Sequence, residues 1–149
     1  MLLQRLVLTV LPLLVSFSVA DKKPGAMYQQ IKKPAWTPPP LVFPIVWTAL
    51  YLMMGYASSR VASSAGLLSL PLLVYAVQLV LNVSWTPVFF GKGDFTLALT
   101  ILRALVAVVV VTAALFWRAD VLAGVLLLPY LVWLGVAHEL NRSIVALNP

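Results

Sequence analysis

The sequence predicts an all-α membrane protein, and three observations support this fold class. Of its 149 residues, 62% are hydrophobic and 9% are charged, whereas a soluble domain carries about 25% charged residues. The apolar residues gather in stretches of about 20, the length of a helix that crosses a bilayer. Prolines and lysines separate these stretches in segments typical of loops. The chain length fits a single domain with four or five transmembrane helices.

Composition also excludes several classes of site. The sequence has no cysteine and one histidine, so it offers neither a disulfide framework nor a typical set of zinc ligands. The net charge of +6 lies mostly in the predicted loops, where it indicates membrane topology and contact with anionic lipids. We therefore expect no nucleic-acid partner, no metal site and no required cofactor.

The first apolar stretch, residues 2–20, has two interpretations. Arg5, the apolar residues after it and a small-residue site ending at Ala20 match a secretory signal peptide. The same residues also fit a short first transmembrane helix with Pro12 near its middle. The residues alone do not choose between the two.

A Pro-rich loop follows in residues 21–40, and we expect it to cap the bundle between the first two helices. Pro34 and the prolines at 38–40 fix backbone angles and remove amide donors, which makes the segment stiff and extended. Trp36 lies inside this segment. It is either an interfacial anchor or a lid over whatever the bundle holds, and a stiff lid loses little entropy when it closes.

The second predicted helix, residues 41–61, has an aromatic face and a set of small residues. Helical spacing places on one face Trp47, Tyr51, Met54 and Ser58. Gly55, Ser59 and Ser63 recur at every fourth position, a pattern that lets two helices approach closely. Because the pattern is common by chance, it is a weak signal for dimerisation.

The third predicted helix, residues 67–90, carries a polar and aromatic stripe. Spacings of four, three and four place on one face Gln78, Asn82, Trp85 and Phe89. Lipid offers no hydrogen-bond partner, so this face meets protein, water or a ligand. The amides either bond neighbouring helices or line a ligand pocket. Pro87 is expected to bend or end the regular helix.

The fourth predicted helix, residues 95–117, is rich in valine and alanine, with Arg103 as the exception. A guanidinium at this depth costs about 3 kcal/mol unless it reaches the interface or finds a partner. Three roles are open. The side chain snorkels toward Lys92, pairs with an acidic side chain, or anchors a ligand carboxylate.

The fifth predicted helix, residues 121–144, has a third aromatic stripe. One face carries Tyr130, Trp133, Ala137 and Asn141. Near the end of the helix, Glu139 and Arg142 are three residues apart, which predicts a local ion pair beside His138.

Basic residues are distributed unequally between the two ends of a five-helix arrangement. Six lie on the side of the first loop and the C-terminus: Lys22, Lys23, Lys32, Lys33, Lys92 and Arg142. Three lie on the other side: Arg5, Arg60 and Arg118. Because positive residues are enriched on the cytosolic side, we expect the first loop and the C-terminus to face the cytosol.

Three motifs resemble those of the TspO/MBR family of translocator proteins. They are YQQIKKPAWTPPPLVFPIVWTALYLMMGYAS from Tyr28, QLVLNVSWTPVFFG from Gln78 and PYLVWLGVAHELN from Pro129. Their order and spacing match the family, and the resemblance covers the chain from Tyr28 to Asn141. It favours a retained first helix, and therefore a bundle of five transmembrane helices.

The resemblance implies a membrane protein, often a homodimer, that binds tetrapyrroles such as protoporphyrin and heme precursors. In animals the family also binds cholesterol and synthetic isoquinoline or benzodiazepine-type ligands. It further implies a role in transport, sensing or regulation of tetrapyrrole metabolism, in a mitochondrial or other organelle membrane or in a bacterial envelope. The pocket positions that match are Trp36, Trp47, Tyr51, Asn82, Trp85, Trp133 and Ala137.

Some residues depart from the family pattern. The C-terminal segment LNRSIVALNP lacks the tyrosine of the mammalian sterol consensus, although Leu52, Tyr56 and Arg60 fit its loose form. His138 stands where a small or hydroxyl residue is expected. It is either a polar residue at the membrane interface or a further contact with a macrocycle or its metal.

Phe89 from the third helix and Arg103 complete the set of candidate binding residues. Two alternatives to a binding and transport role are open: light-dependent porphyrin degradation with Trp47 and Trp133 as reactive groups, or a membrane scaffold. The sequence shows no nucleophile–base pair and no carboxylate dyad, so we do not expect conventional catalysis.

Overall fold

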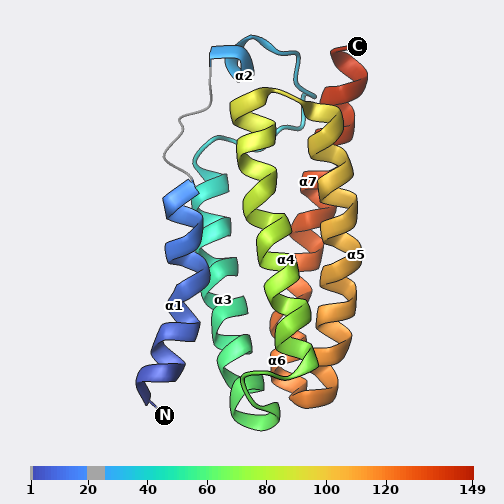
Figure 1. The fold of residues 1–149 in the computed structure, drawn as a ribbon. Helices are drawn as coiled ribbons and strands as arrows, with labels where there is room; N and C mark the ends of the chain where they lie inside the picture. Colours follow the sequence, from blue (N-terminus) through green and yellow to red (C-terminus); the bar gives the residue numbers. More distant parts are fainter. Residues whose placement is uncertain (1, 20–25) are drawn as a thin grey trace.

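The structure is a computed structural model that describes residues 2–19 and 26–149. Every regular element within these residues is helical, which confirms the predicted all-α class (Figure 1). The elements are α1 (Leu2–Val19), α2 (Ala26–Gln30), α3 (Val42–Ala65), α4 (Leu70–Thr86), the π-helix η1 (Pro87–Lys92), α5 (Phe95–Ala119), α6 (Val121–Leu126) and α7 (Leu128–Leu147).

Four helical segments in the described part of the chain are long and apolar enough to cross a membrane. They are Val42–Ala65, Leu70–Lys92, Phe95–Ala119 and Val121–Leu147. These segments run alongside one another, with α2 and the C-terminus at one end and the α3–α4 turn and α6 at the other (Figure 1). Helix α1 is apolar but shorter, and it packs beside α3. The protein is therefore an integral membrane protein.

The third predicted helix differs from the expected residues 67–90 at both ends. Gly66 has a φ of 89°, a conformation that favours glycine, so α3 ends before it and α4 begins at Leu70. Proline cannot donate an amide hydrogen bond, and the α-helix ends before Pro87, as predicted. The chain continues as the π-helix η1. This helix ends at Lys92, and the next residue, Gly93, has a φ of 67°.

The span predicted over residues 121–144 consists of two helices, α6 and α7. Pro129 lies in the first turn of α7, where its missing N–H leaves no hydrogen bond unmade. The Leu127 N–H bonds the Gly124 carbonyl at 3.1 Å and closes α6. In α7, Arg142 Nη2 lies 2.8 Å from Glu139 Oε2, which confirms the predicted ion pair.

Gly55 allows α1 to lie directly against α3. A Cβ atom added at this position would overlap the backbone carbonyl of Thr9. Gly55, one of the small residues spaced by four on α3, therefore serves a contact within the chain.

Two groups of buried apolar side chains fill the bundle. The larger group includes Met54, Phe116 and Tyr130, and it joins α3, α5 and α7. The smaller group includes Phe89 and Ile144, and it lies around η1 and the adjoining ends of α5 and α7. Trp85 packs against both groups, at the level where the interior is hollow.

Candidate functional site

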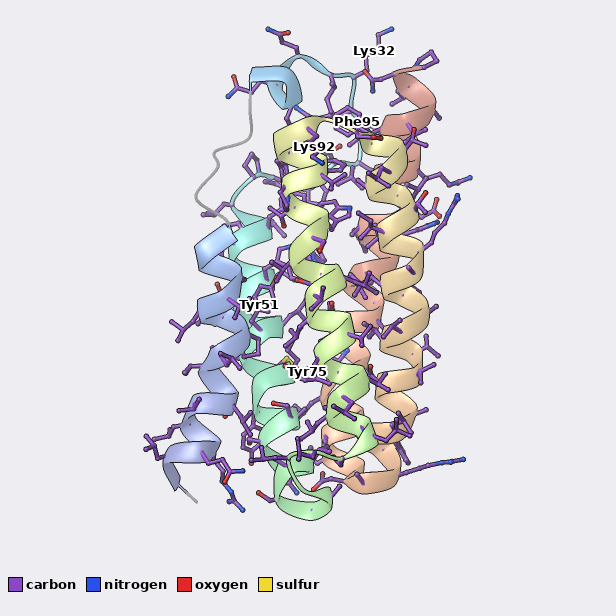
Figure 2. The ribbon with its side chains drawn as sticks, viewed as in Figure 1. Lys32, Tyr51, Tyr75, Lys92 and Phe95 are labelled. Carbon is purple, nitrogen blue, oxygen red and sulfur yellow. The ribbon has the colours of Figure 1, made fainter. Side chains whose placement is uncertain are left out.

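A cavity of about 260 Å³ opens inside the bundle toward the end that carries α2. Figure 2 shows Tyr51, which lines it, near the middle of the bundle, with Lys32, Lys92 and Phe95 at the α2 end. The cavity is lined by Leu13, Ser16, Tyr28, Phe43, Pro44, Trp47, Thr48, Tyr51, Asn82, Trp85, Thr86, Phe89, Phe90, Leu102, Leu105, Trp133, Leu134, Ala137 and Leu140. Its surface is mostly apolar, with a few hydroxyl groups and one carboxamide.

Seven of the ten candidate binding residues line this cavity. They are Trp47, Tyr51, Asn82, Trp85, Phe89, Trp133 and Ala137. They come from α3, α4, η1 and α7, and the helical stripes predicted from spacing converge because each helix turns its stripe to the same hollow. The sequence therefore located the cavity, while ligand binding within it remains a proposal.

The structure does not bring the other three candidates to the cavity. Trp36 is half exposed in the loop, and Arg103 is exposed on the outer face of α5. His138 Nδ1 lies 3.1 Å from Glu139 Oε1, outside the lining. Among the described residues, Arg103 has no carboxylate partner, and no three potential metal ligands come together.

Asn82 joins three helices through two tyrosines. Its Oδ1 accepts a hydrogen bond from Tyr51 Oη at 2.6 Å, and its Nδ2 donates to Tyr130 Oη at 2.8 Å. The Tyr130 hydroxyl in turn donates to Gln78 Oε1 at 3.1 Å. Both amides therefore bond neighbouring helices, one of the two alternatives that the sequence left open. Asn82 also lines the cavity, so its second oxygen lone pair can still accept from a ligand.

Paired aromatic rings form part of the cavity wall. Trp47 stacks on Tyr51 with ring centroids 5.4 Å apart, and Trp85 stacks on Phe89 at 4.6 Å. Trp133 meets the ring of Phe43 edge-on at 5.7 Å. Such faces offer wide apolar contact to a planar ligand.

The tryptophan N–H groups differ in their partners. Trp85 Nε1 donates to Asn141 Oδ1 at 3.2 Å. Trp133 Nε1 is buried and has no acceptor among the described residues. An unpaired buried donor is costly, and the Trp133 ring lies in the cavity wall.

Tyr28, rather than Trp36, covers the α2 end of the cavity. Its ring lies 5.7 Å from that of Phe89 and 4.9 Å from that of Phe90, and Lys33 Nζ lies 4.3 Å from its centroid. Burial raises the pKa of the Tyr28 phenol. Tyr28 lies in α2, which has five residues and is too short to show a helical period. The sequence therefore indicated only that Tyr28 lies near the membrane interface.

The segment after α2 is tied to the end of α7 by Asn148. The Lys32 N–H donates to Asn148 Oδ1 at 3.0 Å, and Asn148 Nδ2 donates to the Lys32 carbonyl at 3.0 Å. Figure 1 shows this segment passing beside the C-terminal end of the chain before it returns to α3. Residues 26–41, which cover this end of the cavity, are thus held by the ring contacts of Tyr28 and by the hydrogen bonds of Lys32.

Helix α1 contributes to the cavity, which the sequence did not predict. Leu13 and Ser16 lie in its lining. These residues belong to the stretch that the signal-peptide interpretation would remove.

Comparison with known proteins agrees with the motifs over nearly the whole chain. The TspO/MBR family model matches residues 5–147. The chain is 41% identical over 129 residues to "Protein CrtK" of Rhodobacter capsulatus, which covers 85% of this chain and 81% of that protein. It is 42% identical over 126 residues to the "Tryptophan-rich sensory protein" of Cereibacter sphaeroides, covering 85% and 79%. It is 39% identical over 121 residues to the "Translocator protein" of Sus scrofa, covering 78% and 72%. The chain therefore belongs to the TspO/MBR family.

Proposed function

We propose that the protein binds tetrapyrroles in the 260 Å³ cavity, which we call the aromatic cavity. In this proposal it either transports tetrapyrroles across a membrane or senses them. The observation that carries this proposal is the convergence of stacked aromatic pairs from α3 and from α4 with η1, together with Trp133 of α7, on one mostly apolar hollow. Ligand sites in proteins are typically apolar with a few polar groups that orient the ligand. The relatives named for translocation and for sensing support the same class of function.

In this proposal, α1 also crosses the membrane and brings the number of transmembrane helices to five. Its apolar residues are exposed on the outside, as lipid contact requires, and Leu13 and Ser16 complete the cavity. The unequal distribution of basic residues orients the α2 end and the C-terminus toward the cytosol. A homodimer would not use Gly55 of α3, because α1 lies directly against it.

The size of the cavity sets a condition on tetrapyrrole binding. At about 260 Å³ it lies just below the range of about 300–1,000 Å³ typical of ligand pockets. A macrocycle therefore enters fully only if α2 and residues 31–41 move outward. Lys32, Lys33 and Lys92 lie at this end, where their charges would attract the propionate groups of the ligand. Smaller flat ligands or sterols need less widening.

The test is a titration of the detergent-solubilised protein with protoporphyrin, followed by tryptophan quenching. Ala137→Leu fills part of the cavity without removing an aromatic ring, and we expect it to weaken binding about tenfold, or about 1.4 kcal/mol. Ala107→Leu places the same side chain on the exposed face of α5 and should leave the affinity unchanged. Equal affinities for all three proteins would place the ligand elsewhere.

Light-dependent porphyrin degradation is the second candidate, because the indoles of Trp47, Trp85 and Trp133 all line the cavity. Illumination of the same complex separates the two activities. A binding protein keeps the porphyrin absorbance that a protein-free control shows, whereas a degrading one accelerates its loss. Trp133→Phe should slow that loss if its indole takes part.

A further inference from the structure

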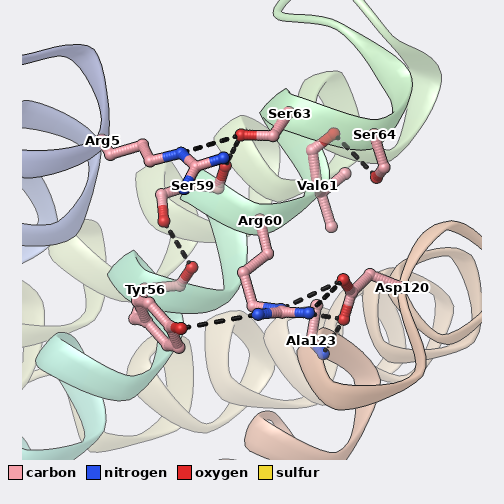
Figure 3. Close-up of polar contacts among 9 residues, drawn as sticks. All are labelled: Arg5, Tyr56, Ser59, Arg60, Val61, Ser63, Ser64, Asp120 and Ala123. Carbon is pink, nitrogen blue, oxygen red and sulfur yellow. Dashed lines mark hydrogen bonds and ion pairs between the residues drawn. The ribbon is translucent and has the colours of Figure 1, made fainter. Parts of the chain in front are cut away.

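A second cavity, of about 510 Å³, lies at the end of the bundle that carries α6, opposite to α2 (Figure 1); Figure 3 shows the polar contacts around it. It is formed by α1, α3 and the turn that leads into α6, and we call it the Arg5 pocket. Its lining consists of Arg5, Leu6, Thr9, Tyr56, Ser59, Arg60, Ser63, Ser64 and Asp120. Most of these side chains are polar or charged, unlike those around the aromatic cavity.

The two arginines of the Arg5 pocket differ in their charge balance. Arg60 Nε lies 3.0 Å from both carboxylate oxygens of Asp120, and its Nη2 lies 2.8 Å from Oδ2 (Figure 3). Arg5 donates from Nε to Ser63 Oγ at 3.2 Å, and it has no carboxylate partner among the described residues. The pocket therefore holds one uncompensated positive charge.

The serine hydroxyls donate to carbonyl groups of α3 itself, so their protons are not available to a ligand. Ser63 Oγ donates to the Ser59 carbonyl at 3.0 Å, and Ser59 Oγ donates to the Tyr56 carbonyl at 2.7 Å. Ser64 Oγ donates to the Val61 carbonyl at 3.3 Å. The Ser63 oxygen in turn fixes the Arg5 guanidinium from its Nε side, which leaves the two Nη groups as the donors for a bound molecule.

Tyr56 supplies a further donor. Its hydroxyl oxygen accepts from Arg60 Nη1 at 3.5 Å, so its own proton remains available. An anion beside Arg5 would meet its Nη groups, whereas the Tyr56 hydroxyl lies on the Arg60 side of the pocket (Figure 3). The anion would meet one acidic side chain, Asp120, whose two oxygens already face Arg60.

We propose that the Arg5 pocket binds a phosphate group at the membrane interface. The guanidinium fork matches the geometry of phosphate oxygens, and charge-assisted bonds of this kind are about twice as strong as neutral ones. The exposed side chains of Leu3, Leu6 and Val10 continue along α1 from the pocket. They would lie against acyl chains if the phosphate belongs to an anionic lipid, and they play no part if it is free phosphate.

Native mass spectrometry of the detergent-solubilised full chain, titrated with short-chain phosphatidic acid, tests this site. Arg5→Gln removes the uncompensated charge and should lower the occupancy of the first bound lipid about tenfold. Arg118→Gln is the matched control, because Arg118 is an exposed arginine at the same end of the bundle and lies outside the pocket. It should leave that occupancy unchanged.

Inorganic phosphate, added as a competitor, identifies the source of the group. Displacement of the lipid by millimolar phosphate supports a site for free phosphate, and retention of the lipid supports a headgroup site. Arg5→Lys keeps the charge and should retain part of the binding, which separates a charge effect from damage to the fold. Equal losses in Arg5→Gln and Arg118→Gln, or no bound lipid and no bound phosphate in the unchanged protein, would overturn the proposal.

Discussion

The two cavities lie at opposite ends of one bundle, and although the surface of both is mostly apolar, they differ in the polar groups that they contain. The aromatic cavity is built from ring faces of α3, α4, η1 and α7, and the Asn82 amide in its wall already bonds two tyrosines. The Arg5 pocket is built from side chains near helix ends, where an arginine keeps an unbalanced charge. Depth in the membrane explains the difference, because an unpaired charge is tolerated near the interface and costs most at the centre.

Helices α1 and α3 both line the aromatic cavity and the Arg5 pocket. Leu13 and Ser16 face the aromatic cavity, while Arg5, Leu6 and Thr9 face the Arg5 pocket. The close approach of α1 to α3 therefore fixes the shape of both. Substitutions between α1 and α3 should affect both cavities, whereas substitutions in the wall of one cavity should affect that cavity alone.

The largest effect is expected from Gly55→Ala, which places a methyl group against the Thr9 backbone and pushes α1 away from α3. Overpacking of this kind costs about 1–3 kcal/mol in the free energy of unfolding. Gly135→Ala is the matched control, since a Cβ there meets nothing within 4 Å. It should stabilise α7 by up to about 1 kcal/mol through helix propensity.

Thermal unfolding in detergent measures both glycine variants. The displacement of α1 should also weaken ligand binding in the aromatic cavity and lipid binding in the Arg5 pocket together. A Gly55→Ala protein as stable as Gly135→Ala would show that α1 is not held where the structure places it.

The second effect concerns the aromatic cavity alone. Asn82→Leu removes the bridge between Tyr51 and Tyr130, and we expect a loss of about 1–2 kcal/mol, since interhelical hydrogen bonds in membranes are worth about 0.6–1.7 kcal/mol each. Tyr51→Phe breaks only one of the two bonds and should cost about half as much. Both are measured by thermal unfolding, with binding at the Arg5 pocket as an internal control that should not change. Equal costs for the two variants would mean that the Tyr130 bond adds nothing.

Sequence periodicity identified the residues that lie on helix faces, but it carried little information about residues near helix ends and loops. The stripes of Trp47 with Tyr51 and of Trp85 with Phe89 were found because a period of 3.6 residues fixes which side chains share a face. The stripe that contains Trp133 joined them for the same reason. Three faces rich in rings and amides have one way to avoid lipid, which is to face one another.

The candidate residues that lie outside the cavity lie where periodicity carries little information. Arg103 belongs to a helix that is apolar on all sides, so the pattern does not reveal which face is buried. His138 follows Ala137 by one residue, and a rotation of about 100° takes it to another face. Trp36 and Tyr28 lie near a loop, and only the tertiary structure decides which of them covers the cavity.

The third effect concerns the Arg5 pocket alone and depends on pH. The hydrogen bond from Arg60 and the Ala123 N–H lower the pKa of the Asp120 carboxyl below its ordinary value of about 4. A carboxyl with a lowered pKa in the folded state stabilises the fold fully above the ordinary pKa. That contribution is lost as the pH falls through the lowered value.

Thermal unfolding between pH 7 and pH 3 should therefore show a loss of stability on the acid side that Asp120→Asn reduces. Asp120→Ala should cost about 1 kcal/mol more at pH 7 than Asp120→Asn, because it also removes the side chain that caps α6. Identical acid limbs for Asp120→Asn and the unchanged protein would assign the pH dependence to another group.

The smallest effect is expected at the cover of the aromatic cavity. Asn148→Ala removes both hydrogen bonds to Lys32, and because these groups are exposed we expect a cost of no more than about 0.5–1 kcal/mol. Local opening should nevertheless increase, since the segment would then be held mainly by the Tyr28 ring contacts. Hydrogen–deuterium exchange at residues 28–37 should accelerate, and porphyrin should associate faster. Arg142→Gln breaks a nearby exposed ion pair without touching the segment, and it should change neither rate. Unaltered exchange in Asn148→Ala would mean that Tyr28 alone keeps the cavity closed, so the cover would open by movement of that ring rather than by release from α7.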